Sequence, residues 1–341
     1  MKPVVYSAMQ PSNEDLTIGN YLGALLHWIR MQDNNECVYC IADMHAISNI
    51  KTNKAIHSSS LDILALYLSC GIDPIKTIAF IQSHVLEHCQ FNWLLSCYAY
   101  FGELKRMTQF KEKQLKAKEP INIGIFNYPI LMTADILLYQ TNIVPIGKDQ
   151  KQHIELTKAI ANRFNNMYGE IFTIPQPCIS EHGSCIMSLL QPNIKMSKSD
   201  INKRNTIYLL DSFYSLEAKL NKTITDSDRP PIIYYEPIFK PGISNLLELL
   251  ACVGKTNIAQ LEIMFEFKAY GCLKKDVISI LNKLLTALQT KYFSIRKDEG
   301  YLNKIIYDGS IRARKKAIIT MNKLYKVLGF SRILTNISNK H

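Results

Sequence analysis

Hydrophobic positions in the first half of the chain follow two alternating spacings. Short apolar runs at residues 4–6, 37–42 and 77–81 predict buried strands. Between them, apolar residues recur every three or four positions at residues 18–29 and 63–68, which predicts helices. Strands that alternate with helices form an open, parallel sheet with helices on both faces. We therefore expect an α/β fold with a doubly wound, Rossmann-like sheet.

The pattern changes in the second half of the chain. Strand-like runs fade, and residues 278–292 and 312–327 have helical periodicity. We divide the chain into an α/β domain of residues 1–205 and an all-helical domain of residues 206–330, followed by a tail of residues 331–341.

Composition narrows the class of protein. Of 341 residues, 47% are hydrophobic and 20% are charged, which supports a large core and excludes a disordered chain. The longest apolar stretch, residues 128–139, is far shorter than the roughly 20 residues that span a bilayer, and the N-terminus lacks the apolar region of a secretory signal. We expect a cytoplasmic protein without membrane contact, whose nine cysteines are free thiols.

Positive charge is concentrated in the second part of the chain. Lys and Arg exceed Asp and Glu by 40 to 29, a net charge of +11, of which +9 lies beyond residue 205. A basic domain is typical of proteins that bind nucleic acid. A compositional bias toward Lys, Asn and Ile explains the excess equally well, so charge alone leaves both explanations open.

The first predicted strand leads into a segment that can hold phosphate. Its small and polar residues are Gln10, Pro11, Ser12, Thr17, Gly19 and Asn20. Ligands of open α/β sheets bind at the carboxyl ends of strands, where helix N-termini offer free N–H groups. Thr17 is a candidate N-cap, Gly19 permits close approach of a ligand, and Asn20 adds an amide donor. Ordinary capping of a β–α turn explains the same residues.

A second segment combines two lysines with small hydroxyl residues. It comprises Lys195, Met196, Ser197, Lys198 and Ser199. Two ammonium groups three positions apart can grip the oxygens of a triphosphate and stabilise charge on leaving pyrophosphate. A solvated surface loop is the alternative. The string is nevertheless specific, because chance would produce it in such a chain only about once in ten thousand.

Together these segments resemble the two signatures of the class I aminoacyl-tRNA synthetases. Residues 195–199 match the second signature, and residues 17–20 look like the variant first signature of the tryptophanyl branch. Further matching segments are residues 43–47, 102–104, 107–111, 134–139, 149–153, 225–228 and 242–247. The resemblance extends to about residue 330. It implies a catalytic α/β domain followed by a helical domain that binds the anticodon region of tRNA.

The resemblance also implies an amino-acid site around Asp135. This carboxylate would accept a hydrogen bond from the indole N–H of tryptophan. Such a site can favour tryptophan over phenylalanine by a factor of up to ~10⁴–10⁵. The walls of the pocket would be Tyr6, His45, Gln109, Met132 and Val144. Without the resemblance, Asp135 also fits a salt bridge or an exposed position of an amphipathic helix, and the wall residues fit ordinary core packing.

A nucleotide site is implied in the same way. Its residues would be Gln10, Pro11, Ser12, Gly19, Asn20, Gly147, Lys148, Asp149, Ile186, Lys195, Met196, Ser197, Lys198 and Ser199. Lys195, Lys198 and Lys113 would be the catalytic lysines, although a solvated position explains Lys113 as well. Asp149 can cap the helix that follows Gly147. ATP would enter as a substrate with Mg²⁺, and we expect no metal site formed by the protein itself.

The activity implied is that of a tryptophan–tRNA ligase. ATP and L-tryptophan would form tryptophanyl-adenylate and pyrophosphate, and tryptophan would then pass to the 3′ end of tRNA(Trp). The family suggests a homodimer, and the densest basic cluster for tRNA is Arg312, Arg314, Lys315 and Lys316. The alternatives are a tyrosine ligase and a non-catalytic RNA-binding paralogue. Asp135 argues against the tyrosine ligase, and the intact lysine pair argues against the paralogue.

Four positions depart from the family pattern, and two motifs mimic other chemistry. Asn13 stands in a first loop one residue longer than usual, Met44 replaces a usual Gln, Thr133 a usual Ala and Lys148 a usual Glu. Residues 84–88 spell an H-x-x-E-H zinc pattern, but they leave a predicted strand and do not lie on one established helix. Residues 37 and 40 are cysteines on opposite faces of a predicted strand, so we expect core residues and no redox pair.

Overall fold

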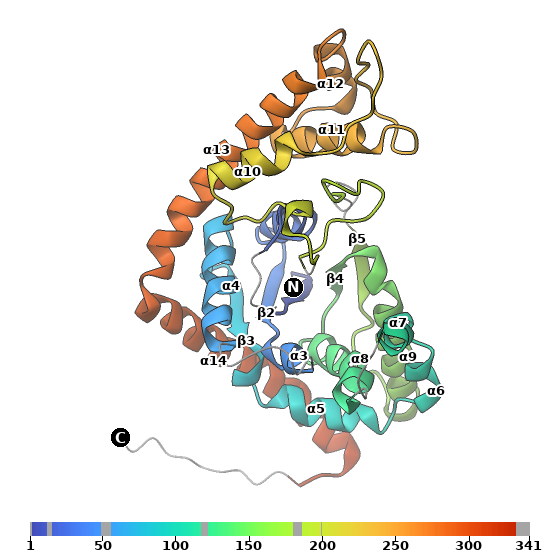
Figure 1. Cartoon of the computed structure of the whole chain (residues 1–341). Helices are drawn as coiled ribbons and strands as arrows, with labels where there is room; N and C mark the ends of the chain where they lie inside the picture. The colour runs from blue at the N-terminus through green and yellow to red at the C-terminus, as the bar shows by residue number, and fades with distance from the viewer. Residues whose placement is uncertain are drawn as a thin grey trace.

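A parallel sheet forms the centre of the computed structural model, which describes residues 2–11, 16–48, 56–116, 122–179, 186–198 and 200–331. Its five strands lie in the order β3-β2-β1-β4-β5 (Figure 1). They are β1 (Val4–Met9), β2 (Glu36–Ile41), β3 (Thr77–Ile81), β4 (Ile143–Ile146) and β5 (Gln176–Ile179). Every pairing between neighbours is parallel. The predicted doubly wound sheet is therefore confirmed.

Two apolar clusters cover opposite faces of the sheet. Alternation along β2 sends Cys37 into one cluster with α4 (Ile56–Cys70), and Cys40 into the other with α5 (Glu87–Ser96) and α8 (Ile123–Leu137). Both cysteines are fully buried, as predicted for core residues. The other helices of this half are α1 (Ile18–Asn20), α2 (Leu26–Met31), α3 (Asp43–Ile47), α6 (Phe101–Lys105), α7 (Thr108–Lys116) and α9 (Lys151–Tyr168).

The helix predicted after the first strand contains an irregular turn. Residues 18–31 are helical throughout, but a π-helical segment at Tyr21–Leu25 separates α1 from α2. Such segments are rare and occur often at functional sites. The π-helical segment directly follows Gly19 and Asn20 of the candidate phosphate segment.

The second half of the described chain is helical, as its periodicity predicts. It contains α10 (Phe213–Asn221), α11 (Pro241–Gly254), α12 (Ile258–Met264), α13 (Tyr270–Arg296) and α14 (Glu299–Leu328). Helices α10 to α12 lie above the sheet, and the long α13 descends from them along α4 (Figure 1). Apolar residues of α11, α13 and the start of α14 join the same cluster as α4, so one core connects the two halves.

The last helix, α14, returns to the sheet and covers its edge strand, β3. Gly309 makes this approach possible, because a Cβ at this position would lie 1.8 Å from the carbonyl oxygen of Ala79. Three residues later, Arg312 Nη1 donates to the carbonyl oxygens of Pro74 and Thr77, at 3.0 and 2.9 Å. An uncovered edge is a site of unwanted strand pairing, so α14 completes the α/β layer. Helical periodicity predicts α14 but does not predict this position.

Within the described residues, none of the helices combines the length and apolarity needed to cross a bilayer.

The close approach at Gly309 predicts a specific loss of stability. In Gly309→Ala, the new methyl group meets the backbone of β3 and forces the helix and the strand apart, at a cost of about 1–3 kcal/mol. Gly271→Ala is the matched control, since a Cβ there meets no described atom within 4 Å and alanine favours a helix. Urea unfolding of both variants tests this. Equal stability of the two variants would contradict the close packing of α14 on β3.

Candidate active site

A cavity of about 510 Å³ opens at the carboxyl ends of β1 and β4. From β1 the chain passes through β2 to β3 on one side, and it later reaches β4 on the other side. The crevice between β1 and β4 is therefore the switch point at which sheets of this kind bind ligands. Residues 6–10 line the cavity from β1, and residues 144–147 line it from β4.

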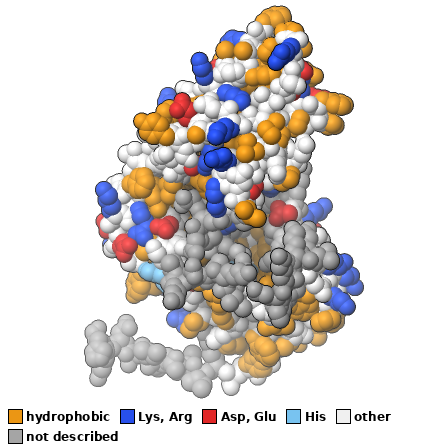
Figure 2. Space-filling view, viewed as in Figure 1, with side chains coloured by type: hydrophobic (Ala, Val, Ile, Leu, Met, Phe, Trp, Pro, Cys, Tyr) orange, Lys and Arg blue, Asp and Glu red, His pale blue; other side chains and the backbone are white. Residues whose placement is uncertain are grey.

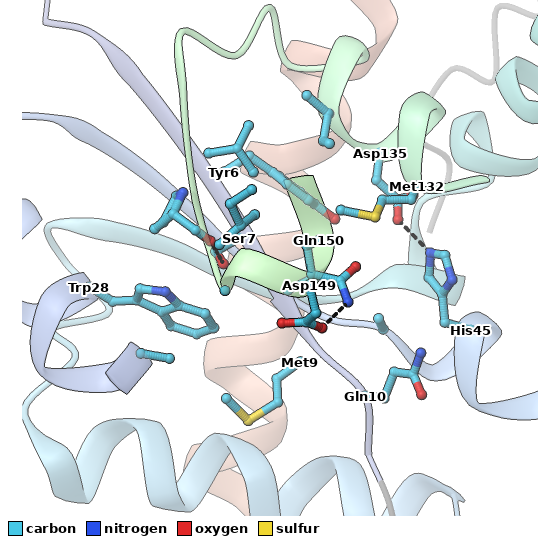
Figure 3. A pocket seen from close by; sticks show the side chains of 18 of the residues that line it. Tyr6, Ser7, Met9, Gln10, Trp28, His45, Met132, Asp135, Asp149 and Gln150 are labelled. Carbon is cyan, nitrogen blue, oxygen red and sulfur yellow. Dashed lines mark hydrogen bonds and ion pairs between the residues drawn. The ribbon is translucent and has the colours of Figure 1, made fainter. Parts of the chain in front are cut away.

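All six residues expected to surround tryptophan meet at this cavity. They are Tyr6, His45, Gln109, Met132, Asp135 and Val144. They come from β1, α3, α7, α8 and β4, and Figure 3 shows Asp135, Met132 and His45 close to one another. The fold thus gathers residues that lie far apart in the sequence onto one wall.

The carboxylate of Asp135 is buried and accepts hydrogen bonds from three side chains. Its Oδ2 lies 2.9 Å from His45 Nε2, and its Oδ1 lies 2.6 Å from His88 Nδ1. Gln82 Nε2 donates to both oxygens, at 2.8 and 2.9 Å. Of these donors, His45 lines the cavity and appears beside Asp135 in Figure 3. The alternative of an exposed position on an amphipathic helix is excluded, because Asp135 is only 1% exposed.

These partners keep the buried carboxylate ionised. Burial alone would raise the pKa of Asp135, but the facing His88 and His45 rings outweigh it and lower the pKa to about 2. A permanently ionised acceptor in a cavity wall can select a ligand group that donates a hydrogen bond, and it disfavours a ligand that leaves it unpaired.

The first phosphate segment forms a capped helix start beside the cavity. Thr17 Oγ1 accepts from the backbone N–H of Asn20 at 3.2 Å, and Asn20 Oδ1 accepts from the backbone N–H of Thr17 at 3.0 Å. This capping box confirms Thr17 as the N-cap. Gln10 and Asn20 line the cavity, whereas Pro11 is buried. A Cβ on Gly19 would make only ordinary contacts with described residues, so packing there does not require glycine.

The second signature forms a short hairpin whose two lysines are placed differently. Met196 N–H donates to the carbonyl oxygen of Ile186 at 2.9 Å, and both side chains are buried in the core. Lys198 lines the cavity, whereas Lys195 is exposed outside it, and Ser197 is also exposed. The two side chains expected to act as a pair therefore do not both reach the cavity in the described structure.

The turn after β4 brings Gly147 and Asp149 to the cavity. A Cβ on Gly147 would lie 2.6 Å from Asp149 Oδ1, so glycine gives this side chain its room. The expected cap is wrong for α9, whose N-cap is Gln150 with no side-chain cap bond. Asp149 sits in a 3₁₀ turn, and its Oδ2 accepts from Gln150 Nε2 at 2.7 Å. This carboxylate faces the cavity (Figure 3).

Some expected site residues lie outside the described part of the structure. Ser12, Asn13 and Ser199 are not among the described residues, nor are the side chains of Lys113 and Lys148.

The sequence does not single out several side chains that build this site. Tyr128, Gln150 and Trp28 line the cavity, and Tyr128 OH donates to Gln109 Oε1 at 2.8 Å. Gln82 and His88 hold Asp135 from behind the cavity wall. His88 belongs to the H-x-x-E-H string, but its partner is the carboxylate of Asp135. The neighbouring Glu87 pairs with Arg314 at 3.0 Å.

Two of the departures from the family pattern are accommodated by local contacts. Thr133 is fully buried on α8, where its hydroxyl donates to the carbonyl oxygen of Pro129 at 2.9 Å and meets the Thr157 hydroxyl at 3.0 Å. Its extra polar atom is therefore satisfied. Met44 is half-buried, and its sulfur receives the Cys89 thiol at 3.6 Å.

An open parallel sheet with a cavity at its switch point is typical of α/β proteins that bind nucleotides, and comparison with known proteins identifies the family. The sequence model of the tRNA synthetases class I (W and Y) matches residues 1–286. The chain belongs to this family, and it is an aminoacyl-tRNA ligase.

Individual relatives match this chain over nearly its full length. The tryptophan–tRNA ligase of Buchnera aphidicola subsp. Acyrthosiphon pisum is 53% identical over 328 residues, which cover 96% of this chain and 97% of the relative. The tryptophanyl-tRNA synthetase of Mycoplasma pneumoniae has a TM-score of 0.90 at 32% identity and covers 97% of this chain and 99% of its own. The Campylobacter jejuni enzyme, solved with ADP and tryptophan, has a TM-score of 0.82 at 32% identity, with coverage of 96% and 100%.

The lowered pKa of Asp135 predicts a pH-dependent contribution to stability. Its folded pKa of about 2 lies below the unfolded value of about 3.9, so its stabilisation is complete above pH ~4 and is lost toward pH ~2. Compared with Asp135→Asn, the wild type should gain about 2–3 kcal/mol from this ionisation at neutral pH. The difference should shrink by about 1 kcal/mol by pH ~3. Urea unfolding at stepped pH measures it, and a difference that is constant with pH would exclude the assigned ionisation.

Proposed function

We propose that this chain is a tryptophan–tRNA ligase and that the cavity between β1 and β4 is where it activates tryptophan. Relatives of this name are 52–53% identical over nearly the whole chain. The structural observation that supports the choice of amino acid is the buried, ionised Asp135 in the cavity wall. An indole ring carries one N–H, which this acceptor can receive, whereas a phenyl ring has none.

The amino acid is oriented by groups around that carboxylate. The indole N–H donates to Asp135 Oδ2 from the cavity side, at the position where His45 donates in this structure. Tyr6, Met132 and Val144 pack against the ring faces and edges. If phenylalanine entered, Asp135 would receive no hydrogen bond from the ligand. In sites of this kind, such a loss disfavours the wrong substrate by a factor of up to ~10⁴–10⁵.

The nucleotide lies between the end of β1 and the hairpin of Lys195 and Lys198. The carboxylate of tryptophan attacks the α-phosphorus of ATP. A carboxyl oxygen–phosphorus bond forms, the bond between the α- and β-phosphates breaks, and pyrophosphate leaves. Lys198, which lines the cavity, stabilises the charge on the leaving group. Lys195 and Lys113 are the further lysines that we assign to this role.

Other groups complete the substrate complex. ATP brings Mg²⁺ with it, which neutralises phosphate charge. Gln10, Asn20 and Gly147 lie where the nucleotide enters, and Asp149 offers a carboxylate there. We extend the nucleotide site to the other residues of the same sequence segments, which are Pro11, Ser12, Gly19, Lys148, Ile186, Met196, Ser197 and Ser199. In the second step a hydroxyl of the 3′-terminal ribose of tRNA attacks the aminoacyl carbonyl and AMP leaves.

Pyrophosphate exchange tests the activity and the lysines together. The wild-type chain should exchange pyrophosphate into ATP with tryptophan and not with tyrosine. Lys198→Ala and Lys195→Ala should each lower kcat by about 10²–10³, because each removes a donor to the charged leaving group. Lys76→Ala, an exposed lysine paired with Asp33, is the control and should not change the rate.

The outcomes of this assay are distinct. Exchange with tyrosine instead of tryptophan would assign the related tyrosine enzyme, and exchange with neither would indicate an RNA-binding paralogue. An unchanged rate in Lys195→Ala would remove the hairpin from the mechanism.

The helical part, residues 206–330, supplies the surface for tRNA(Trp). Lys and Arg side chains recur over this part of the molecule in Figure 2. The cluster on α14 is less suited to tRNA than its density suggests, because Arg312, Arg314 and Lys316 already bond to the α/β layer, although Arg312 and Arg314 stay exposed together with Lys315. The exposed lysines of α13, such as Lys283, are better placed, since α13 rises toward the outer helices (Figure 1).

Salt dependence of tRNA binding tests this surface. The double variant Lys275→Ala, Lys283→Ala removes two exposed lysines of α13. It should reduce the slope of log Kd against log salt by nearly one for each of these lysines that binds a phosphate. Lys316→Ala, whose ammonium is paired with Glu36 at 2.8 Å, should leave the slope unchanged. The reverse pattern would place tRNA on α14 instead.

The chain functions as a homodimer in the cytoplasm, where it supplies charged tRNA for translation. An exposed apolar surface on and beside α5, α6 and α8 suits a second copy. Its members are Leu86, Trp93, Tyr100, Phe101 and Ile123, each at least 60% exposed. Sedimentation of the purified chain as a monomer would contradict the dimer.

A further inference from the structure

A second layer of hydrogen bonds stands behind the cavity wall. His88, at the start of α5, places Nδ1 2.6 Å from Asp135 Oδ1 and Nε2 2.8 Å from the hydroxyl of Tyr139. Neither His88 nor Tyr139 lines the cavity that contains Asp135. His88 is fully buried and Tyr139 is 2% exposed. Tyr139 and His88 therefore connect the protein interior to the acceptor, Asp135, from outside the cavity.

The direction of these hydrogen bonds follows from the chemistry of the three groups. An ionised carboxylate only accepts, so His88 must carry a proton on Nδ1. With His88 as a neutral ring, Nε2 presents a lone pair, and the Tyr139 hydroxyl 2.8 Å away donates to it. Burial, with Cys40 and Asp135 nearby, holds the pKa of Tyr139 well above its usual value, so this hydroxyl keeps its proton. Tyr139 thus selects the tautomer of His88 that donates to Asp135.

Aromatic packing fixes the geometry of these three groups. The His88 ring stacks on Phe80 of β3, with centroids 5.8 Å apart, and lies 5.5 Å from the ring of Tyr139. Tyr139 in turn stacks on Tyr6, at 5.6 Å and 12° between planes. Since Tyr6 forms a wall of the cavity, the same rings position the acceptor and the surface on which the ligand ring lies.

The donors of Asp135 differ in their relation to the cavity. His88 and Gln82 approach from the interior, whereas His45 approaches from the cavity wall. A carboxylate offers about four lone-pair positions. The interior donors approach Oδ1 and the space between the two oxygens, so the donor that Oδ2 receives from the cavity side is His45, at 2.9 Å.

We propose that Tyr139 and His88 are positioning residues that set the preference of this site for indole-bearing amino acids. They hold Asp135 in the orientation in which Oδ2 receives a donor from the cavity. Neither residue takes part in the bond changes of the reaction. The inference rests on the proposed function, since it concerns how the acceptor selects tryptophan.

Tyr139→Phe is the most direct variant, because it removes one oxygen and keeps the ring. Without this hydroxyl, His88 can place its proton on Nε2 and turn a lone pair toward Asp135. We expect KM for tryptophan in pyrophosphate exchange to rise about tenfold, as for the loss of one hydrogen bond, while kcat changes less than threefold. Discrimination against phenylalanine should fall by a similar factor. Tyr67→Phe is the matched control, since the Tyr67 hydroxyl is also buried but has no hydrogen-bond partner among the described residues.

Substitution of His88 separates positioning from simple packing. In His88→Asn the amide nitrogen can occupy the place of Nδ1 and donate to Asp135 without any tautomer, so most of the selectivity should be retained. In His88→Gln the amide nitrogen lies near the place of Nε2, so this variant should not retain the selectivity for tryptophan. If Tyr139 acts through His88, Tyr139→Phe should add no further increase in KM to His88→Asn. An equal increase in both backgrounds would overturn the proposal.

Nuclear magnetic resonance gives a readout independent of activity. With ¹⁵N-labelled histidine, the wild-type chain should show His88 as a neutral ring protonated on Nδ1, and Tyr139→Phe should shift this ring toward the other tautomer. A wild-type ring protonated on Nε2 alone would overturn the proposal. Absence of any exchange with tryptophan by the wild type would instead overturn the proposed function, while the tautomer could still be observed.

Discussion

A charged group inside a protein must be surrounded by donors, and much of this site follows from that requirement at Asp135. Isolated burial of a carboxylate costs far more than a single domain gains on folding, so the charge must be compensated where it lies. The donors come from α3, from the turn after β3 and from α5, while the carboxylate itself belongs to α8. These elements stack on one face of the sheet. The acceptor is therefore correctly placed only when that entire face has assembled.

The two signature segments are coupled through backbone hydrogen bonds as well as through a shared ligand. Residues 206–209 run beside the first signature, where Ile18 N–H donates to the carbonyl oxygen of Ile207 at 2.9 Å. On the other side, the Thr206 hydroxyl donates to the carbonyl oxygen of Ser197 in the second signature, also at 2.9 Å. Residues 206–209 therefore link the lysine hairpin to the helix start at the end of β1. The same short strip begins the helical half of the chain.

Local patterns predict the elements of this fold better than they predict its contacts. The apolar runs of β1, β2 and β3 identify buried parallel strands because both faces of such strands are covered. The role of His88 is not predictable in this way, because its partner Asp135 lies 47 residues further along the chain. The capping role expected of Asp149 fails because a 3₁₀ turn precedes α9 and moves the N-cap to Gln150. The placement of Lys198 and Lys195 likewise depends on how the hairpin meets the cavity.

The position of α14 has a consequence for how the chain is made. The ribosome completes β3 more than two hundred residues before α14 (Glu299–Leu328) emerges, and until then the outer edge of the sheet lacks its cover. During that interval the nascent chain carries an exposed strand edge of the kind that recruits other strands. Synthesis of the α/β half alone is therefore not enough to give the catalytic layer its outer boundary, which α14 supplies later. A chain that stops before α14 leaves that edge available for aggregation or proteolysis.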